Sequence, residues 1–357
     1  MLTSRVSKPF RRSVIAAALA AGLSGTFLAA NGAPNESLEG GRVFVADRAS
    51  GTVSVIDART NQLETTLSLP PAPNAAEPMY VFFSPLRRRV FVGDRGNDRV
   101  VAFNARTLAV EGTAKAGAGV FHMWGNTDTK QLWVNNDVDL TVSVVDIVTL
   151  ATIATVPIPA DLVALGGKPH DVIVDPDGDH AYVSVTSVKG PTDYVVRYDA
   201  ATFQEVDRVE VGDDPHVSLS QSDELLFVPC QDADAVYVFD RTDMSKVKIV
   251  DVPGAHGAGM VQSGATFYTT NLPGGGPDAL YAIDTASLNV VGTPTDAPYD
   301  TPHNIALSRN GKNLYLTHSG SKADKVTVYS VQLPDPTPVL VAEVTVGLNP
   351  FGLAYVP

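Results

Sequence analysis

The fold is decided by the stretch Gly167-Lys168-Pro169-His170-Asp171-Val172-Ile173-Val174-Asp175-Pro176-Asp177-Gly178. A Pro-His pair opens it, an alternating apolar strand follows, and Asp-Pro-Asp-Gly turns the chain at the end. The same cassette returns around His216 and around His303, and more loosely at His122 and His256. A cassette that recurs along a chain predicts a repeat protein.

A second type of strand follows each cassette. It opens with an aromatic or apolar residue before valine or a β-branched residue, and it ends near a polar or turn-forming residue. Its copies are Phe44 to Asp47, Phe91 to Asp94, Trp133 to Asn136, Tyr182 to Val185, Phe227 to Cys230, Tyr268 to Asn271 and Tyr315 to His318.

A third strand type alternates in character and mostly ends in Asp or Asn. Its copies are Thr52 to Asp57, Arg99 to Asn104, Thr141 to Asp146, Tyr194 to Asp199, Ala235 to Asp240, Ala279 to Asp284 and Lys325 to Ser330. A terminal Asp or Asn can accept hydrogen bonds from backbone amides two residues on, which starts a turn. A further β-branched strand, such as Leu63 to Leu69, leads to the next cassette.

These markers predict an all-β, seven-bladed propeller of four-stranded blades, because the unit repeats about every 45 residues. No stretch outside the N-terminal leader has a helical periodicity. The propeller is expected over residues 42–357. It enters on a second strand and finishes on a lone first strand, Phe351 to Val356, which can complete the first blade and close the ring. Closure removes the exposed sheet edges that invite aggregation.

The first 32 residues read as a signal peptide, and residues 33–41 read as a linker. Arg5, Lys8, Arg11 and Arg12 precede a short apolar run over 14–30. We therefore expect a periplasmic or secreted protein with no membrane span after cleavage. The Arg11-Arg12 pair also loosely fits a twin-arginine signal, so the export route stays open.

Charge and cysteine content limit the partners. The net charge of the chain is −13, and loss of the four basic leader residues takes it to −17. So acidic a surface argues against binding nucleic acid or anionic membranes. Cys230 is the only cysteine, so no internal disulfide can form. We expect a monomer.

The repeats resemble the YVTN-repeat seven-bladed β-propeller family, a family of secreted or periplasmic proteins. The resemblance covers nearly the whole mature chain and rests on the aromatic-valine opening of the second strands. It implies the propeller fold. The functions of the family are diverse, so the resemblance implies no particular activity.

Aligning the cassettes on their histidines places one residue of each at the start of the innermost strand of a blade. These slots are Met79, His122, His170, His216, His256, His303 and Phe351. They should ring one mouth of the central channel. The second strands return to the same face, because neighbouring strands are antiparallel. Their ends are Asp47, Asp94, Asn136, Val185, Cys230, Asn271 and His318.

Converging imidazoles are a typical site for zinc or copper. The predicted ligands are His122, His170, His216, His256 and His303, with Asp47, Asp94, Cys230, His318 and Met79 as additional candidates. Sulfur from Cys230 or Met79 would favour copper(I). The histidine ring resembles the copper-binding propeller of nitrous oxide reductase and periplasmic zinc chaperones of propeller fold, and this resemblance implies copper or zinc.

Our leading hypothesis is that the histidine ring binds a transition metal, or a small ligand through that metal. One alternative is a metal-free scaffold that binds another protein or a polymer on the same face. A second alternative is a lactonase-type hydrolase or lyase that uses His and Asp as acid and base. A further interpretation is that the histidines are simply part of how the repeat is built, because repeats carry residues for packing alone. Whether the protein is an enzyme stays open.

Overall fold

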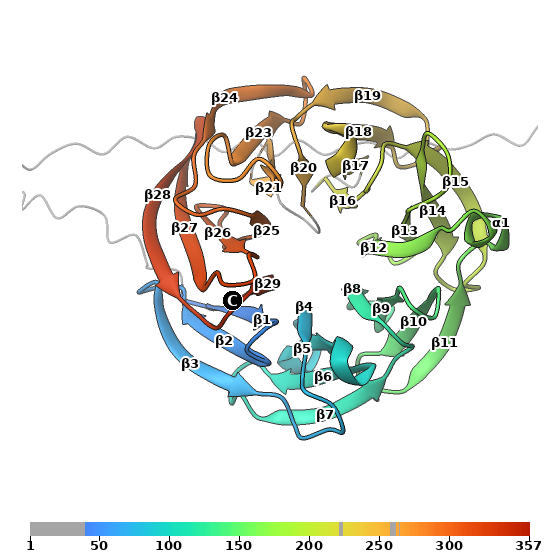
Figure 1. Cartoon of the computed structure of the whole chain (residues 1–357), viewed down its shortest axis with the longest axis horizontal. Coiled ribbons are helices and arrows are strands. Elements are labelled where there is room, and N and C mark those ends of the chain that lie inside the picture. Colours follow the sequence, from blue (N-terminus) through green and yellow to red (C-terminus); the bar gives the residue numbers. More distant parts are fainter. Residues whose placement is uncertain (1–39, 221–223, 258–261, 264) are drawn as a thin grey trace, which may run out of the picture. The chain divides into compact units, whose positions relative to one another are not determined.

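The computed structural model describes residues 40–220, 224–257, 262–263 and 265–357. The expected signal peptide (1–32) and all but the end of the expected linker (33–41) lie outside the described residues. Within them, seven β-sheets are arranged as blades around a central channel (Figure 1). The predicted all-β, seven-bladed propeller is confirmed.

Each blade contributes its innermost strand to the channel. These strands are β4 (Pro78–Ser84), β8 (Val120–Asn126), β12 (Lys168–Val174), β16 (Ser218–Leu219), β20 (Ala255–His256) with β21 (Gln262–Ser263), β25 (Pro302–Leu307) and β29 (Pro350–Val356). In the sixth blade both β20 and β21 pair with the second strand, so the inner position is divided into two pieces.

The second strands lie next to the inner ones, and their bounds agree closely with the sequence prediction. They are β1 (Arg42–Asp47), β5 (Arg89–Asp94), β9 (Gln131–Asn136), β13 (His180–Thr186), β17 (Leu225–Cys230), β22 (Thr266–Asn271) and β26 (Asn313–His318).

The third and outer strands complete the blades. The third strands are β2 (Thr52–Asp57), β6 (Arg99–Asn104), β10 (Thr141–Asp146), β14 (Asp193–Asp199), β18 (Ala235–Asp240), β23 (Leu280–Asp284) and β27 (Lys325–Gln332). The outer strands are β3 (Gln62–Ser68), β7 (Val110–Lys115), β11 (Thr152–Pro157), β15 (Glu205–Val211), β19 (Lys246–Asp251), β24 (Asn289–Thr295) and β28 (Asp335–Thr345).

The ring closes as predicted, because β29 pairs antiparallel with β1 in the first blade. Arg42 lies opposite Val356, and Asp47 lies opposite Pro350. The C-terminal strand therefore supplies the inner position of the blade that β1 begins, and β1 has no open edge toward the channel.

Short helical segments interrupt the connections. One α-helix, α1 (Ala160–Ala164), precedes β12, and the 3-10 segments are η1 (Leu86–Arg88), η2 (Arg95–Asn97) and η3 (Gln231–Ala233). Sequence periodicity does not reveal α1, because five residues are too few to show a helical period. Among the described residues, no helix is long and apolar enough to cross a membrane.

The core lies between adjacent blades and is built mainly from the second and third strands. Large aromatic side chains at the predicted second-strand position are fully buried, among them Phe44, Phe91, Trp133, Tyr182 and Phe227. Truncating such a residue to alanine typically costs about 3–5 kcal/mol. This packing holds each blade at a fixed position around the channel.

The polar ends of the third strands start turns as predicted. Asp57 Oδ1 accepts hydrogen bonds from the amides of Arg59 and Thr60, at 2.8 and 3.1 Å. Asn104 does the same for two amides, at 3.0 and 2.9 Å. These bonds fix the hairpin between the third and outer strands.

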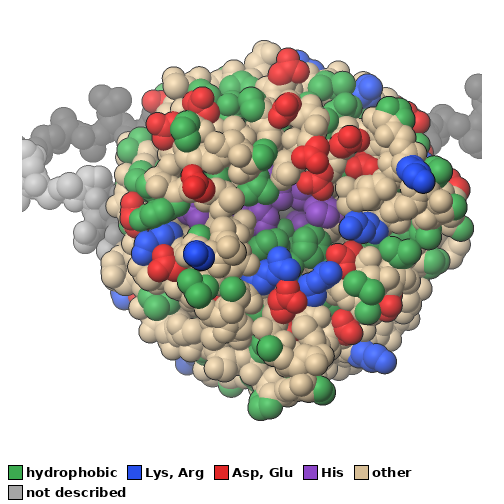
Figure 2. All heavy atoms as spheres, in the orientation of Figure 1, with side chains coloured by type: hydrophobic (Ala, Val, Ile, Leu, Met, Phe, Trp, Pro, Cys, Tyr) green, Lys and Arg blue, Asp and Glu red, His purple; other side chains and the backbone are tan. Residues whose placement is uncertain are grey.

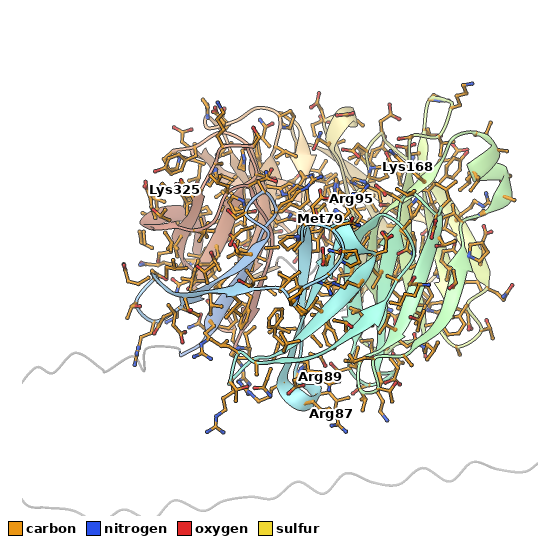
Figure 3. All side chains as sticks on the ribbon, turned by 60° about the horizontal axis from the view of Figure 1, so that its bottom comes forward. Met79, Arg87, Arg89, Arg95, Lys168 and Lys325 are labelled. Carbon is orange, nitrogen blue, oxygen red and sulfur yellow. The ribbon has the colours of Figure 1, made fainter. Side chains whose placement is uncertain are left out.

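The two ends of the channel differ. Met79, Arg95 and Lys168 lie toward one end of the ring, and Arg87 and Arg89 lie toward the other (Figure 3). Strand β4 therefore runs from the first end to the second. The first end, where the inner strands begin, is called the mouth below.

Candidate metal centre

The inner strands are irregular where they begin. In β4, β8, β12 and β25 the pairing with the second strand shifts by one residue, for example between Pro169 and Val172. Two inner-strand residues there face a single residue of the partner, which is a β-bulge. A bulge breaks the alternation of side chains, so two consecutive residues can both point into the channel.

The bulges create two layers of side chains. The outer layer, at the mouth, holds the first bulge residue of three strands, Phe121, His170 and His303, whereas the corresponding Met79 packs into the core. The inner layer holds the second: Tyr80, His122, Asp171 and Asn304. The predicted alignment placed His122 in the slot of His170, and this was wrong by one residue. Val120 pairs with Asn136 as Pro169 pairs with Val185, so Phe121 is the equivalent of His170.

The five predicted histidines nevertheless meet at one opening. Figure 2 shows the histidines together at the centre of the mouth. Neighbouring ring centroids are 5.3 Å apart for His122 and His170, and 4.6 Å for His170 and His216. The series continues at 3.9 Å from His216 to His256 and at 4.5 Å from His256 to His303. Phe351 follows, 4.2 Å from His303.

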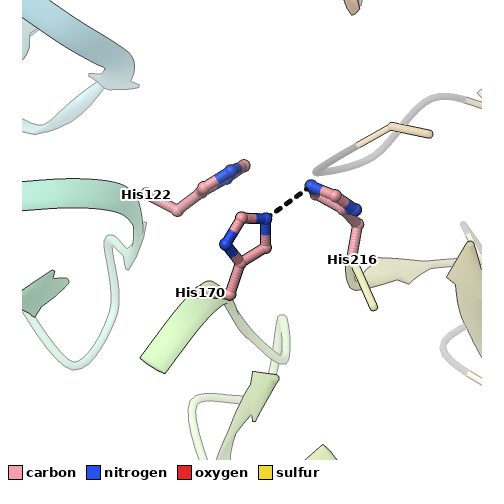
Figure 4. A group of neighbouring side chains, drawn as sticks. All are labelled: His122, His170 and His216. Carbon is pink, nitrogen blue, oxygen red and sulfur yellow. Dashed lines mark hydrogen bonds between the residues drawn. The ribbon is translucent and has the colours of Figure 1, made fainter. Parts of the chain in front are cut away.

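Three of these histidines form a tighter group, here called the triad: His122, His170 and His216 (Figure 4). One nitrogen from each ring lies within 4.8 Å of the others, which suits a shared metal ion. The Nε2 atoms of His170 and His216 are only 2.9 Å apart, so one donates a hydrogen bond to the other. The triad gathers ligands from three consecutive blades.

Asp171 orients the third imidazole of the triad. Its Oδ1 lies 2.8 Å from Nδ1 of His122. A proton held on Nδ1 leaves Nε2 of His122 with its lone pair, and this buried Nε2 has no hydrogen-bond partner in the described part of the chain. A carboxylate behind a histidine is the usual second partner of a metal ligand, because it fixes the tautomer and the ring orientation.

Burial disfavours the charged forms of His122, His216 and Asp171. It lowers the pKa of His122 well below the ordinary value, and the neighbouring His170 lowers it further. Burial and the same neighbour also lower the pKa of His216. Neutral imidazole is the form that binds metal ions. Burial raises the pKa of Asp171 to about 7, although the amides of Val217 and Val172 donate to it.

The other two histidines of the ring lie beside the triad. Neither ring nitrogen of His256 has a hydrogen-bond partner among the described residues, and its side chain is buried. The Nδ1 atom of His303 lies 3.0 Å from the side-chain amide of Asn304. Burial lowers the pKa of His303 to about 3.

The two additional acidic candidates have partners inside their own blades. Asp47 Oδ2 accepts hydrogen bonds from the hydroxyls of Thr52 and Ser54, at 2.9 and 2.8 Å. Asp94 Oδ2 accepts a charge-assisted bond from Nε of Arg99 at 2.8 Å. Both carboxylates thus hold a second strand to the third strand of the blade.

The remaining additional candidates are also bound within blades or the core. His318 Nε2 lies 2.9 Å from the hydroxyl of Thr327, and its Nδ1 lies 3.2 Å from the carbonyl of Asp300. Cys230 is buried in an apolar cluster with its thiol 3.4 Å from the carbonyl of Val228, and burial raises its pKa. Met79 is buried in the core between the second and third blades.

Sequence reasoning missed Asp171 as a functional residue. It stands in the stretch that revealed the repeat, directly after His170. Regular strand alternation would turn it away from that histidine, and only the bulge brings both residues into the channel. A second carboxylate, Asp214, lies 3.5 Å from Nε2 of His170 at the rim.

Charged side chains surround the histidines. Acidic side chains gather above them, and basic ones lie mainly below them with acidic neighbours (Figure 2). Arg48 and Arg95 of the rim are paired with Glu77 at 2.6 Å and with Asp137 at 2.9 Å. A surface hollow that includes His170 is lined by four aspartates and two lysines: Asp193, Asp213, Asp214, Asp232, Lys168 and Lys189. The guanidinium of Arg48 lies 5.4 Å from the ring centre of Phe351, and that of Arg95 lies 5.8 Å from the ring centre of Phe121.

Solved structures share this fold at low sequence identity. The periplasmic gluconolactonase of Pseudomonas aeruginosa aligns with 89% of this chain and 99% of its own, at 18% identity and a TM-score of 0.67. Hydrazine synthase of Kuenenia stuttgartiensis aligns with 78% of this chain and 89% of its own, at 20% identity and a TM-score of 0.62. Likeness at such identities shows the fold alone. No curated protein matches the sequence.

A family comparison is more specific than these likenesses. The family model described as "Lactonase, 7-bladed beta-propeller" matches residues 34–253, which is more than half of the chain. The matched region includes all three histidines of the triad and Asp171. The blade count described above agrees with that family description. This chain therefore belongs to the seven-bladed β-propeller family of lactonases.

Proposed function

We propose that the protein binds a transition metal ion through His122, His170 and His216. The observation that carries this proposal is the convergence of three imidazoles, with one nitrogen from each within 4.8 Å of the others. Two of the rings are buried, and Asp171 holds the ring of His122 from behind at 2.8 Å. A purely structural histidine would be expected to bond a backbone group, whereas Nε2 of His122 finds no partner within the described residues.

The ligand set favours zinc or copper(II). Three imidazoles are a common ligand set for a zinc ion that keeps one position open for water or substrate. Copper(I) prefers sulfur ligands. The contacts of Cys230 lie within the apolar core, which removes the main argument for copper(I).

The rim supports delivery of a cation to the triad. His170 is the most exposed triad member, with 18% of its side chain accessible. Four carboxylates line the hollow beside it and outnumber its two lysines, Lys168 and Lys189. A group of carboxylates at an opening raises the local concentration of cations. The ion would therefore reach the triad from the mouth.

Metal analysis of protein made without a histidine tag tests this proposal. We expect about one zinc or copper ion per chain after dialysis against either metal. The single variants H122A, H170A and H216A should lose it. The matched control is H180Q, because His180 lies in a hairpin outside the mouth. Equal metal content in all four variants and the native chain would overturn the proposal and favour the metal-free scaffold.

Lactone hydrolysis is a second candidate function, and family membership favours it. A bound metal would act as a Lewis acid on the lactone carbonyl. The residues themselves offer two histidine–carboxylate pairs, His122 with Asp171 at 2.8 Å and His170 with Asp214 at 3.5 Å. The second pair lies at the rim, where a substrate can reach it. In the chain without a metal on His170, this imidazole would take a proton from the attacking water and return it to the departing ring oxygen, and Asp214 would stabilise the imidazolium formed in between.

Acid release from an aldonolactone, followed in a pH-stat, tests this second function. We expect a rate above the spontaneous reaction that falls in H170A and D214N and is retained in H180Q. A rate equal to that of the buffer, in protein shown to be metal-loaded, would remove lactone hydrolysis and leave metal binding in place.

We also propose that the protein is exported to the periplasm or secreted. The support is the basic and then apolar leader at residues 1–32. Cell fractionation of the full chain tests this, with removal of residues 1–32 as the control. Recovery of the full-length chain in the cytoplasm alone would overturn it.

A further inference from the structure

A chamber lies behind the histidines, in the channel interior. Its volume is about 230 Å³, and its lining comes from inner strands of the first, second, third, fourth and seventh blades. Tyr80, His122, Asp171 and Asn304, the inner layer of the bulges, form its end toward the mouth. The chamber thus shares two residues with the metal centre, the triad member His122 and its partner Asp171.

The walls of the chamber are apolar and largely aromatic. Phe82 and Trp124 lie with their ring centres 5.6 Å apart, and Phe83, Leu307 and Tyr355 also line the space. Aromatic walls bind aromatic ligands through edge and face contacts as well as through buried area. An apolar cavity of about 150 Å³ can hold benzene. A chamber of 230 Å³ has room for such a ring with small substituents.

The lining residues of the chamber farther from the mouth are the more exposed ones. Strand β4 runs from the Met79 end of the ring toward the Arg87 end (Figure 3), and the chamber residues Tyr80 to Phe83 follow Met79 along it. Phe83, Trp124 and Leu307, deeper along their strands, are partly exposed. Entry from this end would not require a ligand to pass the imidazoles.

The inner end of the chamber offers neutral hydrogen-bonding groups. The Tyr80 hydroxyl accepts a bond from the Asn304 amide at 3.4 Å, which leaves the hydroxyl proton to donate. The same amide nitrogen faces Nδ1 of His303 and the carbonyl of Phe351, so the amide oxygen is the part of Asn304 left to accept a bond. A hydroxyl group both donates and accepts, so it matches this pair.

Charged ligands fit poorly. No lysine or arginine is among the described residues that line the chamber, so a carboxylate would have no counter-ion there. Both oxygens of Asp171 already receive hydrogen bonds from the backbone, so Asp171 is not waiting for a cation. Burying an unpaired charge is far more costly than burying a neutral polar group that finds a partner.

We propose that this chamber binds a neutral monocyclic molecule that carries a hydroxyl group, with the ring between the aromatic walls and the hydroxyl at Tyr80 and Asn304. The class is that of simple phenols and similar small aromatic alcohols. This site goes beyond the proposed metal function and does not depend on it.

Calorimetric titration with 4-methylphenol, and with p-xylene as its shape-matched partner without the hydroxyl, tests the proposal. We expect saturable binding of both, with 4-methylphenol tighter by about 2- to 10-fold, as one hydrogen bond allows. Binding should quench the fluorescence of Trp124, because Trp124 lines the chamber. The only other tryptophan of the sequence, Trp133, is buried against Tyr198 and Phe203 of the fourth blade. No saturable binding of either compound would overturn the proposal.

Two variants locate the ligand. A354F places a ring in the chamber and should abolish binding, whereas A154F, on the outer strand β11, is the matched control and should leave it unchanged. N304L should reduce the preference for 4-methylphenol, because only the Tyr80 hydroxyl then remains as a partner, while p-xylene still binds. Equal binding in A354F and A154F, or an unchanged preference in N304L, would contradict the assignment.

A separate control distinguishes this site from the metal centre. Titrations of the H170A variant, and of native protein treated with a chelator, should give the same affinity for 4-methylphenol as untreated protein. A loss of binding in either would show that the compound binds at the triad instead of in the chamber. Failure of the metal proposal alone would leave these affinities unchanged.

Discussion

Two buried histidines at neighbouring blades show how differently the protein uses the same residue. His318, at the end of β26, has both ring nitrogens bonded, one to Thr327 and one to Asp300. His256, in β20, has neither nitrogen bonded within the described part of the chain. A buried polar group without a partner costs about 1–3 kcal/mol. The bonds of His318 thus stabilise its blade, whereas the unbonded nitrogens of His256 carry an energetic cost. Nε2 of His122 carries the same cost, and an ion bound by the triad would relieve it.

The largest effect should separate H122A from H318A. We expect H122A to weaken zinc or copper affinity by more than about 100-fold. That is more than the loss expected when a residue that only hydrogen-bonds a metal ligand is removed. H318A should keep the affinity but lower the free energy of unfolding by about 1–3 kcal/mol, because its two partners lose their bonds. Competition with a chromophoric chelator and urea unfolding measure the two quantities. Weaker metal binding in H318A would erase the distinction.

The next effect concerns the residue behind the triad. D171N should weaken metal affinity by about 10- to 100-fold. The amide that replaces the carboxylate can keep its oxygen toward His122, but its NH2 group then takes the place of the oxygen that accepts from the amide of Val217 at 2.9 Å. His122 thus loses a charged partner while keeping its place as a ligand.

The control for D171N is metal stoichiometry at saturation, which should remain that of the native protein. An unchanged affinity would mean that Asp171 only supports the strand. If fewer ions bind per chain but the chains that still bind have the native affinity, part of the sample has misfolded.

Asp47 and Asp94, at the ends of two second strands, differ in their partners. They stand at equivalent positions in neighbouring blades, but only Asp94 has a cationic partner, Arg99, at 2.8 Å. Burial raises the pKa of Asp47 to about 6, in spite of the hydroxyls of Ser54 and Thr52. The ordinary value in an unfolded chain is about 3.9. The raised value favours the protonated form in the folded state, so this contribution to stability is lost as the pH rises through about 6.

We therefore expect D47N to raise the free energy of unfolding by about 1–3 kcal/mol at pH 8 and to change it little at pH 4. D94N should lower it by about 1.5–3 kcal/mol at neutral pH, because the buried end of Arg99 loses a charged acceptor. Urea unfolding across this pH range measures both. A loss of stability in D47N at pH 8 would show that its carboxylate is stabilised by groups other than the two hydroxyls.

The smallest effect is expected for Cys230. C230A should lower the free energy of unfolding by about 1 kcal/mol, because it removes a buried sulfur from an apolar cluster. It should leave zinc and copper content unchanged. A drop in copper(I) content in C230A would show that the Cys230 thiol is a copper ligand and not only a residue of the core.

The spacing of the sequence repeats predicted the bounds of many blade strands. β2, β6, β10 and β18 have the predicted bounds, and β29 closes the ring. That success has a physical basis, because blade strands alternate in character and end in turn-forming residues such as Asp57. The shared mouth of the histidines followed from antiparallel geometry alone.

The register of the site could not be read in the same way. Aligning cassettes on histidine placed His122 one residue from its true equivalent, because a bulge adds a residue without leaving a mark in the sequence. The same bulge concealed Asp171. Side-chain direction was the second limit. Asp47, Asp94 and His318 stand at the predicted strand ends, but their hydrogen bonds are made inside the blades.

The triad draws its ligands from the third, fourth and fifth blades, one from each. A bound ion would cross-link the three blades across the two interfaces between them, because its ligands lie far apart along the chain. Backbone amide hydrogen exchange at those two interfaces should become slower when the metal binds and faster when a chelator removes it. The exchange rate at the interface between the seventh and first blades should not change. Local opening of the ring would thus become sensitive to the supply of metal in the surroundings.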